Sequence, residues 1–216
     1  MHRTTLFLLL VVAVCLASPV RALDAPAISW AELAPPPVEY ENPFNELTAE
    51  QMDGLRRLVR LQSQVASGES SAAADASALQ AELESSGLDV DGLLAKRLEI
   101  MMLRRAATNG VNELLIGKTV RIPGYVLPLE FVDQKAVEFL LVPTVGACIH
   151  TPPPAANQLV HVRYPQGVEI RGYYDPVWIG GQLAAENSVQ AVRYVDGERS
   201  VETSYFMQPV LVEPYR

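Results

Sequence analysis

The period of the hydrophobic pattern changes once along this chain, at Gly117, and this change limits the possible folds more than any other feature. Before Gly117, apolar residues recur at three- and four-residue spacing, which is typical of helices. After it, apolar and polar residues alternate in short runs bounded by Gly, Pro, Asp or Asn, which is typical of half-buried strands. Gly124, inside the first run, predicts a bulge and a bend. The pattern predicts five strands, near residues 120–127, 136–145, 158–164, 177–184 and 204–212.

The expected fold class is therefore α+β. A helical region over residues 47–110 precedes a small five-stranded β-barrel over residues 111–216, and its strand count favours the OB-like type that binds oligonucleotides or oligosaccharides. Asp196-Gly197 predicts a hairpin turn near the end of the barrel. A sandwich with the same number of strands is the alternative architecture.

Local signals divide the helical region. Thr48 and Gln51 form a capping box before a helix that we expect to end near Ser67. A Ser/Ala-rich linker near residues 67–78 has too little apolar side-chain area to fix its structure, and it leads into a weak helix ending near Ser85.

A third helix is predicted from Asp89 or Asp91 to Asn109-Gly110. One face carries Leu94, Leu98, Met101 and Met102, and methionine at helical spacing is usually core. We therefore expect this face to be buried. The opposite face should be solvated, and it carries Lys96, Arg97, Arg104 and Arg105.

Two segments precede the helices. Residues 1–22 show the order of a secretory signal peptide: a basic residue, Arg3, then an apolar run, and then a cleavage site of the small-residue type that ends at Ala22. We predict cleavage after Ala22 and a periplasmic location. Residues 23–46 form a proline-rich extended arm. We find no later run of about 20 apolar residues, so we expect membrane association only through a partner.

The charge and the cysteine count exclude some classes of protein. Loss of residues 1–22 lowers Lys plus Arg from 17 to 15 against 25 Asp plus Glu, which leaves a net charge of −10. Nucleic acid is therefore not an expected partner, because its affinity rests on basic groups that release counterions. One cysteine, Cys148, remains after cleavage, so an intramolecular disulfide cannot form.

Cys148 and His150 are the residues with the most distinctive chemistry. On a strand they would share one face, and thiolate and imidazole suit Zn²⁺ or Cu⁺. A periplasmic Zn or Cu binding protein is thus one alternative, although His161 is expected on the polar face of its strand and too distant to be the third ligand. A thiol-dependent enzyme, with His150 as the base for Cys148, is a second alternative. The leading interpretation has no cofactor and no catalytic residue.

Four motifs in the second half of the chain carry a resemblance. They are Gly-Tyr-Val-Leu-Pro-Leu-Glu at 124–130, Glu-Phe-Leu-Leu-Val-Pro at 138–143, Cys-Ile-His-Thr-Pro-Pro-Pro at 148–154 and Tyr-Asp-Pro-Val-Trp at 174–178. This pattern resembles a family of exported bacterial proteins of unknown function, from which residues 155–156 depart because the family more often has proline there. The resemblance implies an envelope accessory encoded beside ABC-type permeases, and it implies no enzymatic activity.

The sequence therefore predicts a non-enzymatic periplasmic binding or adaptor protein whose partner is an envelope protein, with an ABC-type permease component as the candidate. Three consecutive prolines form a stiff segment, and nearby aromatic residues, including Tyr164 and Tyr173, offer a surface for a peptide, a proline-rich segment or a sugar. The predicted partner-binding residues are Cys148, His150, Pro152, Pro153, Pro154, Asn157, Tyr174, Asp175 and Trp178.

Overall fold

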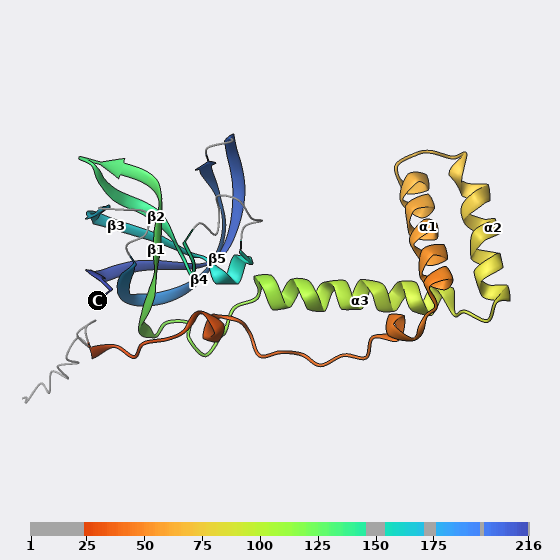
Figure 1. Ribbon diagram of the computed structural model, residues 1–216, viewed down its shortest axis with the longest axis horizontal. Helices are drawn as coiled ribbons and strands as arrows, with labels where there is room; N and C mark the ends of the chain where they lie inside the picture. Colours follow the sequence, from red (N-terminus) through yellow and green to blue (C-terminus); the bar gives the residue numbers. More distant parts are fainter. Residues whose placement is uncertain (1–23, 146–153, 171–175, 195–196, 216) are drawn as a thin grey trace, which may run out of the picture.

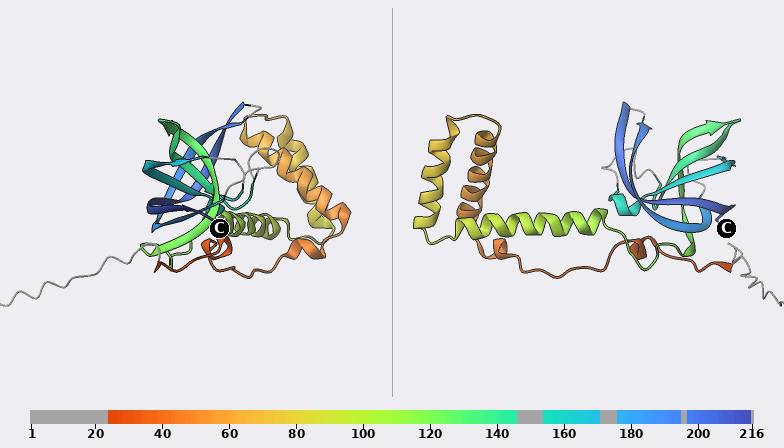
Figure 2. Two further views of the ribbon diagram at one scale, coloured as in Figure 1. Left: turned by 60° about the vertical axis from the view of Figure 1, so that its left-hand side comes forward. Right: turned by 180° about the vertical axis from the view of Figure 1, so that it is seen from behind.

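The computed structural model describes residues 24–145, 154–170, 176–194 and 197–215. A five-stranded sheet closes into a ring at one end of the molecule, and two antiparallel helices stand at the other (Figure 1). The third helix joins them, and a view from behind shows the same elongated arrangement (Figure 2). The prediction of an α+β fold, with helices followed by five strands, is confirmed.

The capping residues found in the sequence begin two of the three helices. The Thr48 side chain accepts a hydrogen bond from the Gln51 amide, and the Gln51 side chain accepts one from the Thr48 amide. Asp89 accepts from the Gly92 amide at the start of the last helix. The helices are α1 (Ala49–Ala66), α2 (Ala72–Ser85) and α3 (Val90–Asn109).

Helix α2 begins earlier than the sequence predicts, so the linker is shorter than residues 67–78. Ala72 and Ala76 are buried residues of α2, and their small side chains allow this helix to pack closely on α1. The contact between α1 and α2 is tight at Gly54, where an added Cβ would lie 2.7 Å from Leu83 Cδ2. Both helices therefore depend on small residues as well as on their shared apolar cluster.

Most of the α3 face that was expected to be core is exposed, although Leu94 packs against the helical cluster. Leu98, Met101 and Met102 are 57%, 48% and 66% exposed. The first turns of α3 pack on α1 and α2, where Val90 and Leu93 are buried, and its last turn rests on the sheet. The middle of the helix crosses the space between these two ends, which is why its methionines are not covered.

The sheet has the strand order β1-β2-β3-β5-β4, with β4 returning to β1. Adjacent strands are antiparallel except for β3 and β5, which are parallel. The β4 and β5 strands stay paired up to Tyr194 opposite Gly197, next to the predicted hairpin turn, and residues 195–196 lie outside the described residues. The strands are β1 (Thr119–Val132), β2 (Lys135–Val142), β3 (Val160–Glu169), β4 (Val177–Tyr194) and β5 (Gly197–Pro214).

Gly124 marks the point where β1 changes partner. Up to Gly124 the strand pairs with β4, and from Tyr125 onward it pairs with β2. A Cβ at Gly124 would meet Leu141 Cγ at 2.7 Å and the Val142 carbonyl oxygen at 2.8 Å, so the bend needs glycine there. The expected bend is present, whereas the register shifts of β1 and β2 fall between Pro128 and Phe131.

Two apolar clusters lie on opposite faces of β2, since neighbouring residues of a strand point in opposite directions. Phe139 and Leu141 belong to the core inside the ring, to which all five strands contribute. Leu140 and Val142 belong to an outer cluster with Leu159 and with Val192 and Val201 from the far ends of β4 and β5. The β4–β5 hairpin therefore covers part of the outside of the ring.

The N-terminal arm is packed on the sheet over its first residues. The Ile28 amide donates to the Arg121 carbonyl at 2.8 Å, and the Arg121 amide donates to the Pro26 carbonyl at 2.9 Å. Leu33 is fully buried, and its carbonyl accepts a hydrogen bond from the Tyr205 hydroxyl at 2.6 Å. Beyond Leu33 the arm runs beside α3 to the helices (Figure 1).

Candidate functional site

A pocket opens at the end of the ring farthest from α3. Its volume is about 490 Å³, and its floor is made by residues that point into the ring from four strands: Val126, Val168, Val177 and Val212. The alternation of the strands places these side chains on the inner face. A mouth of this kind, with an apolar floor and a few polar groups at its edge, is a common site for binding small ligands or side chains.

Aromatic residues form the edge of this pocket. Tyr164 and Tyr215 line it, and Tyr215 stacks on Trp178 with the ring centroids 5.3 Å apart. The Arg121 guanidinium carbon lies 4.9 Å from the centroid of the Trp178 ring, on the side that faces β1. Tyr164 and Tyr215 belong to the pocket, whereas Trp178 and Arg121 lie next to Tyr215 on the outer face of the ring, and we call these four residues the aromatic rim.

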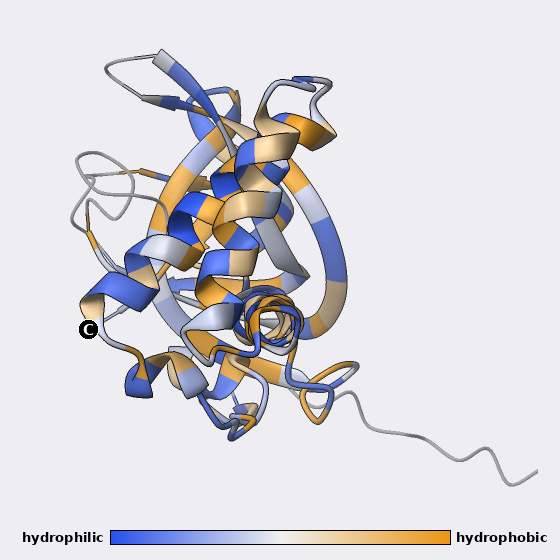
Figure 3. Ribbon diagram, turned by 90° about the vertical axis from the view of Figure 1, so that its right-hand side faces the viewer, coloured by the Kyte–Doolittle hydropathy of each residue, from blue (hydrophilic) through white to orange (hydrophobic). Residues whose placement is uncertain are grey.

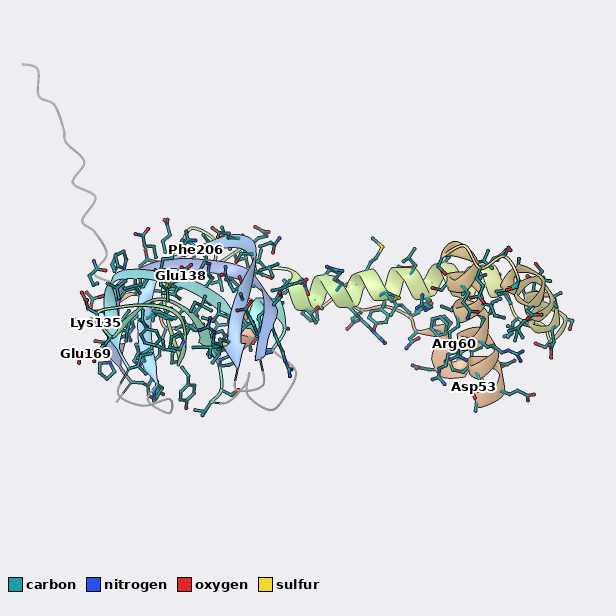
Figure 4. All side chains as sticks on the ribbon, turned by 90° about the horizontal axis from the view of Figure 1, so that it is seen from above. Asp53, Arg60, Lys135, Glu138, Glu169 and Phe206 are labelled. Atoms are coloured by element: carbon teal, nitrogen blue, oxygen red, sulfur yellow. The ribbon has the colours of Figure 1, made fainter. Side chains whose placement is uncertain are left out.

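Charged residues complete the opening. Lys135 and Glu169 are paired across β2 and β3 and line the pocket, and Figure 4 shows them together at the outer end of the ring. On the other side, Glu213 lies 3.6 Å from Arg121. The pocket thus combines an apolar floor, a tyrosine edge and charges of both signs, which suits a ligand with both apolar and polar groups rather than a simple ion.

A second polar cluster lies on the outside of the ring. His161 is 1% exposed, and its Nε2 lies 2.6 Å from Glu138 Oε1, while its Nδ1 lies 3.4 Å from the Gln190 side-chain amide. Arg163 also donates to Glu138 Oε1, at 3.1 Å. Gln190 donates onward to Ser188, which bonds Thr203 at 2.8 Å.

The chemistry of this cluster follows from its partners. The Nε2 atom of His161 faces the Glu138 carboxylate, and its Nδ1 atom faces the side-chain amide of Gln190. Burial alone would raise the pKa of Glu138, but the hydrogen bonds and charges of His161 and Arg163 hold the pKa of this carboxyl below its usual range. Each polar group is satisfied by its neighbours, so the cluster joins β2, β3 and the β4–β5 hairpin.

The position of His161 corrects the prediction that it lines a solvated polar face. Its strand alternates as expected, but Leu159 and His161 are covered by the β4–β5 hairpin, and the Phe206 ring packs edge-on at 5.5 Å. Figure 4 shows Glu138 and Phe206 close together on this side of the ring. The cover comes from residues far along the chain, so alternation within β3 could not reveal it.

The structure places three of the sequence-predicted site residues. Pro154 is partly buried before the 3-10 helix η4 (Ala156–Gln158). Asn157 is 1% exposed, and its side-chain amide donates to the carbonyls of Ala107 and Gly110 at 2.7 and 3.0 Å. Trp178 belongs to the aromatic rim. The other predicted residues, Cys148, His150, Pro152, Pro153, Tyr174 and Asp175, lie outside the described residues.

Asn157 and Trp178 are not brought together. Asn157 closes the C-terminal end of α3, beside which Ser204 donates to the Asn109 carbonyl. Ser204 is next to Tyr205 on β5, and Tyr205 pairs with Ala185 on β4. Trp178 lies seven residues along β4 from Ala185, which is a distance of roughly 20 Å at the rise of a strand. Asn157 therefore has a structural role at the junction, and the pocket lies at the other end of the ring.

The described residues contain no group of three or more His, Cys, Asp or Glu side chains placed to hold a metal ion. The metal and thiol alternatives both rest on Cys148 and His150, and they stay predictions. Among the helices that the structure describes, none has the length and apolar character needed to cross a membrane.

Three helices followed by a closed five-stranded sheet define an α+β protein whose two ends are structurally distinct. A family model described as a protein of unknown function (DUF3299) matches residues 30–214, and the chain belongs to this family. A crystal structure of a DUF3299 family protein from Pseudomonas aeruginosa PAO1 is similar, with 26% sequence identity and a TM-score of 0.48, over 89% of this chain and 97% of that one. No curated protein matches the chain.

Proposed function

We propose that this protein is a non-enzymatic binding or adaptor protein of the bacterial periplasm, and that it holds an apolar or aromatic segment of an envelope protein at the aromatic rim. The observation that carries the proposal is the pocket of about 490 Å³, with its apolar floor, with Tyr164 and Tyr215 in its lining, and with the Trp178 ring stacked on Tyr215. Tyrosine and tryptophan supply large contact areas and a polar group, and they are common in binding surfaces.

The strand order supports the finer description of the sheet as an OB-like barrel. A five-stranded ring in the order β1-β2-β3-β5-β4, with β3 parallel to β5, has the strand count expected of that type. OB folds bind extended ligands, and proteins without a basic groove need ligands other than nucleic acid. The net charge of −8 for the whole chain favours a protein partner.

The predicted signal peptide and the family resemblance support the compartment and the partner. A permease component of an ABC-type transporter is the proposed partner, because the resemblance implies that such proteins are encoded together. The rim presents aromatic faces near Lys135 and Glu213, and this combination fits a segment that offers apolar side chains and main-chain polar groups.

Site-specific photocrosslinking tests this proposal. A photoreactive residue replaces Tyr215 in one protein and Val210, which is 72% exposed elsewhere on β5, in the matched control. Incubated with an envelope extract of the source bacterium, the protein labelled at position 215 should give a discrete adduct that the control lacks. Tyr164→Ala should reduce that adduct, since it removes one wall of the pocket. The same adducts from both positions, or no effect of Tyr164→Ala, would overturn the proposal.

A further inference from the structure

A groove lies at the opposite end of the molecule, between α1, α3 and the end of the arm. Its volume is about 500 Å³. Its apolar lining includes Phe44 from the arm, Met52 and Val59 from α1, and Leu94, Ile100 and Met101 from α3. Figure 3, in which the helices face the viewer, shows hydrophobic and hydrophilic residues interleaved over α1 and α2.

Four arginines also line this groove: Arg56 and Arg60 from α1, and Arg97 and Arg104 from α3. Residues four apart share a helix face, and residues seven apart do so as well. Each helix thus directs two cations toward the same space, in a chain with 25 acidic and 17 basic residues. Like charges four apart destabilise a helix, so this arrangement is not explained by helix stability.

The existing partners leave most of this charge available. Arg56 lies 2.8 Å from Asp53, but both side chains are well exposed, and such pairs are weak. The Arg104 Nε donates to the Tyr40 hydroxyl and not to a carboxylate. Within the described part of the chain, Arg60 and Arg97 have no ion pair; both are exposed, and Figure 4 shows Arg60 projecting from α1.

The apolar lining continues beyond the groove along α3. Leu94, Leu98 and Met101 follow one another at spacings of four and three residues, so they form one stripe on the helix. Leu98 and Met101 are 57% and 48% exposed. Methionine adapts its shape to different partners, and an exposed stripe of large apolar residues indicates a contact surface.

We propose that this groove, which we call the arginine groove, binds an acidic amphipathic helix of a partner protein. The apolar face of such a helix would pack on the stripe of α3 and the floor of the groove, as in other helix-in-groove complexes. Its carboxylates would meet the four guanidinium groups, which bind carboxylates through paired hydrogen bonds. The proposal does not depend on the pocket at the other end of the molecule.

The shape of the groove favours a peptide over a lipid surface. Anionic membranes attract cations that are displayed on an outward-facing surface. Here the arginines line a groove together with apolar residues of α1, α3 and Phe44. A groove that combines apolar residues with four cations matches one helix that has an apolar face and acidic flanks.

The test uses the full chain and a fluorescent peptide of about five helical turns, roughly 18 residues, with leucine on one face and glutamate elsewhere. Binding is followed by fluorescence anisotropy at low and high salt. A peptide with lysine in place of glutamate tests whether charge is required. We expect the acidic peptide to bind, its affinity to fall with salt, and the lysine peptide not to bind.

Two variants locate the binding. Arg60→Glu with Arg97→Glu changes two exposed groove residues, and Arg57→Glu changes an exposed residue of α1 that does not line the groove. The double variant should bind the acidic peptide at least tenfold more weakly, and Arg57→Glu should bind within about twofold of the unaltered protein. Circular dichroism confirms that both variants keep their helices.

Several outcomes would overturn the proposal: equal binding of the two peptides, equal losses in the two variants, or no binding of the acidic peptide. Flotation with phosphatidylglycerol vesicles that depends on Arg60 and Arg97, without peptide binding, would assign the groove to anionic lipid instead. A change in sedimentation of the double variant, again without peptide binding, would assign it to a second copy of this chain. Tyr164→Ala should leave peptide binding unchanged, which separates this test from that of the pocket.

Discussion

The two ends of the molecule are stabilised in different ways. The ring is closed by two pairs of strands that are distant in sequence, β1 with β4 and β3 with β5, and residues from all five strands fill its interior. The helical end relies on short-range features: caps at Thr48 and Asp89 and a cluster of six buried residues. Because local structure opens more easily where few apolar residues are buried, we expect the helical end to open while the ring stays folded.

The largest effect should come from Phe139→Ala, at a fully buried position inside the ring. Loss of a buried phenylalanine leaves a cavity and should lower the free energy of unfolding by about 4 kcal/mol. Urea denaturation followed by tryptophan fluorescence measures this change. Phe131→Ala, at a position that is 55% exposed, is the control and should cost less than about 0.5 kcal/mol. Equal effects would contradict the division between core and surface.

Leu58→Ala tests the helical end, since Leu58 is fully buried between the helices. We expect a local loss of about 3 kcal/mol, seen as faster hydrogen exchange of the α1 and α2 amides. The amides of β1 to β5 should keep their protection. If the strands lose protection to the same extent, the two ends unfold as one unit, and the helical end does not open by itself.

Asn157→Ala addresses the junction between the two ends. Its buried side chain donates to two carbonyls at the end of α3, and without it those carbonyls lose their partner. We expect a loss of about 2 kcal/mol, with faster exchange at the last turn of α3. Asn187→Ala, at an exposed position, should have little effect. Unchanged exchange in α3 would show that other contacts hold the junction.

The smallest effect should be that of Glu138→Gln, and it should depend on pH. The pKa of Glu138 in the folded protein lies below its unfolded value of about 4.3. The ionised carboxylate therefore stabilises the fold above that pH, and this contribution is lost as the pH falls through the lower, folded pKa. The variant should be less stable by about 1 kcal/mol at pH 7, and the difference should shrink below pH ~4.

Glu130→Gln, at an exposed position on β1, is the control for this measurement. Its stability should follow that of the unaltered protein over the whole pH range. A difference for Glu138→Gln that stays constant from pH 7 down to pH ~3 would show that the carboxylate charge does not stabilise the cluster with His161.

Local signals in the sequence predicted the local structure. Thr48, Gln51 and Asp89 act as the caps that their spacing indicates, and Gly124 bends the strand in which it stands. Alternation found all five strands. It did not show that β4 and β5 each run as one strand from the ring to the predicted hairpin, because their far ends are stabilised by the outer cluster, which assembles residues from Tyr125 to Val201.

The candidate sites were harder to predict. Trp178 was identified, but its contact with Tyr215 joins two strand ends that no sequence pattern connects. Arg97 and Arg104 were expected to be solvated, and nothing in the sequence placed Arg56 and Arg60 beside them. Met101 was expected to be core because its spacing is that of a buried face, and only the span of α3 between two separate ends explains its exposure.

The arm gives the molecule a property that a single connecting helix would lack. Ile28 and Leu33 anchor the arm in the ring, Phe44 anchors it against the helices, and Tyr40 bonds Arg104 midway. Two segments of the chain, the arm and α3, thus connect the two ends, and the bond between Tyr40 and Arg104 joins them. A torque applied to the helices is therefore resisted by both segments, and it reaches the ring at two separate points, β1 and η4.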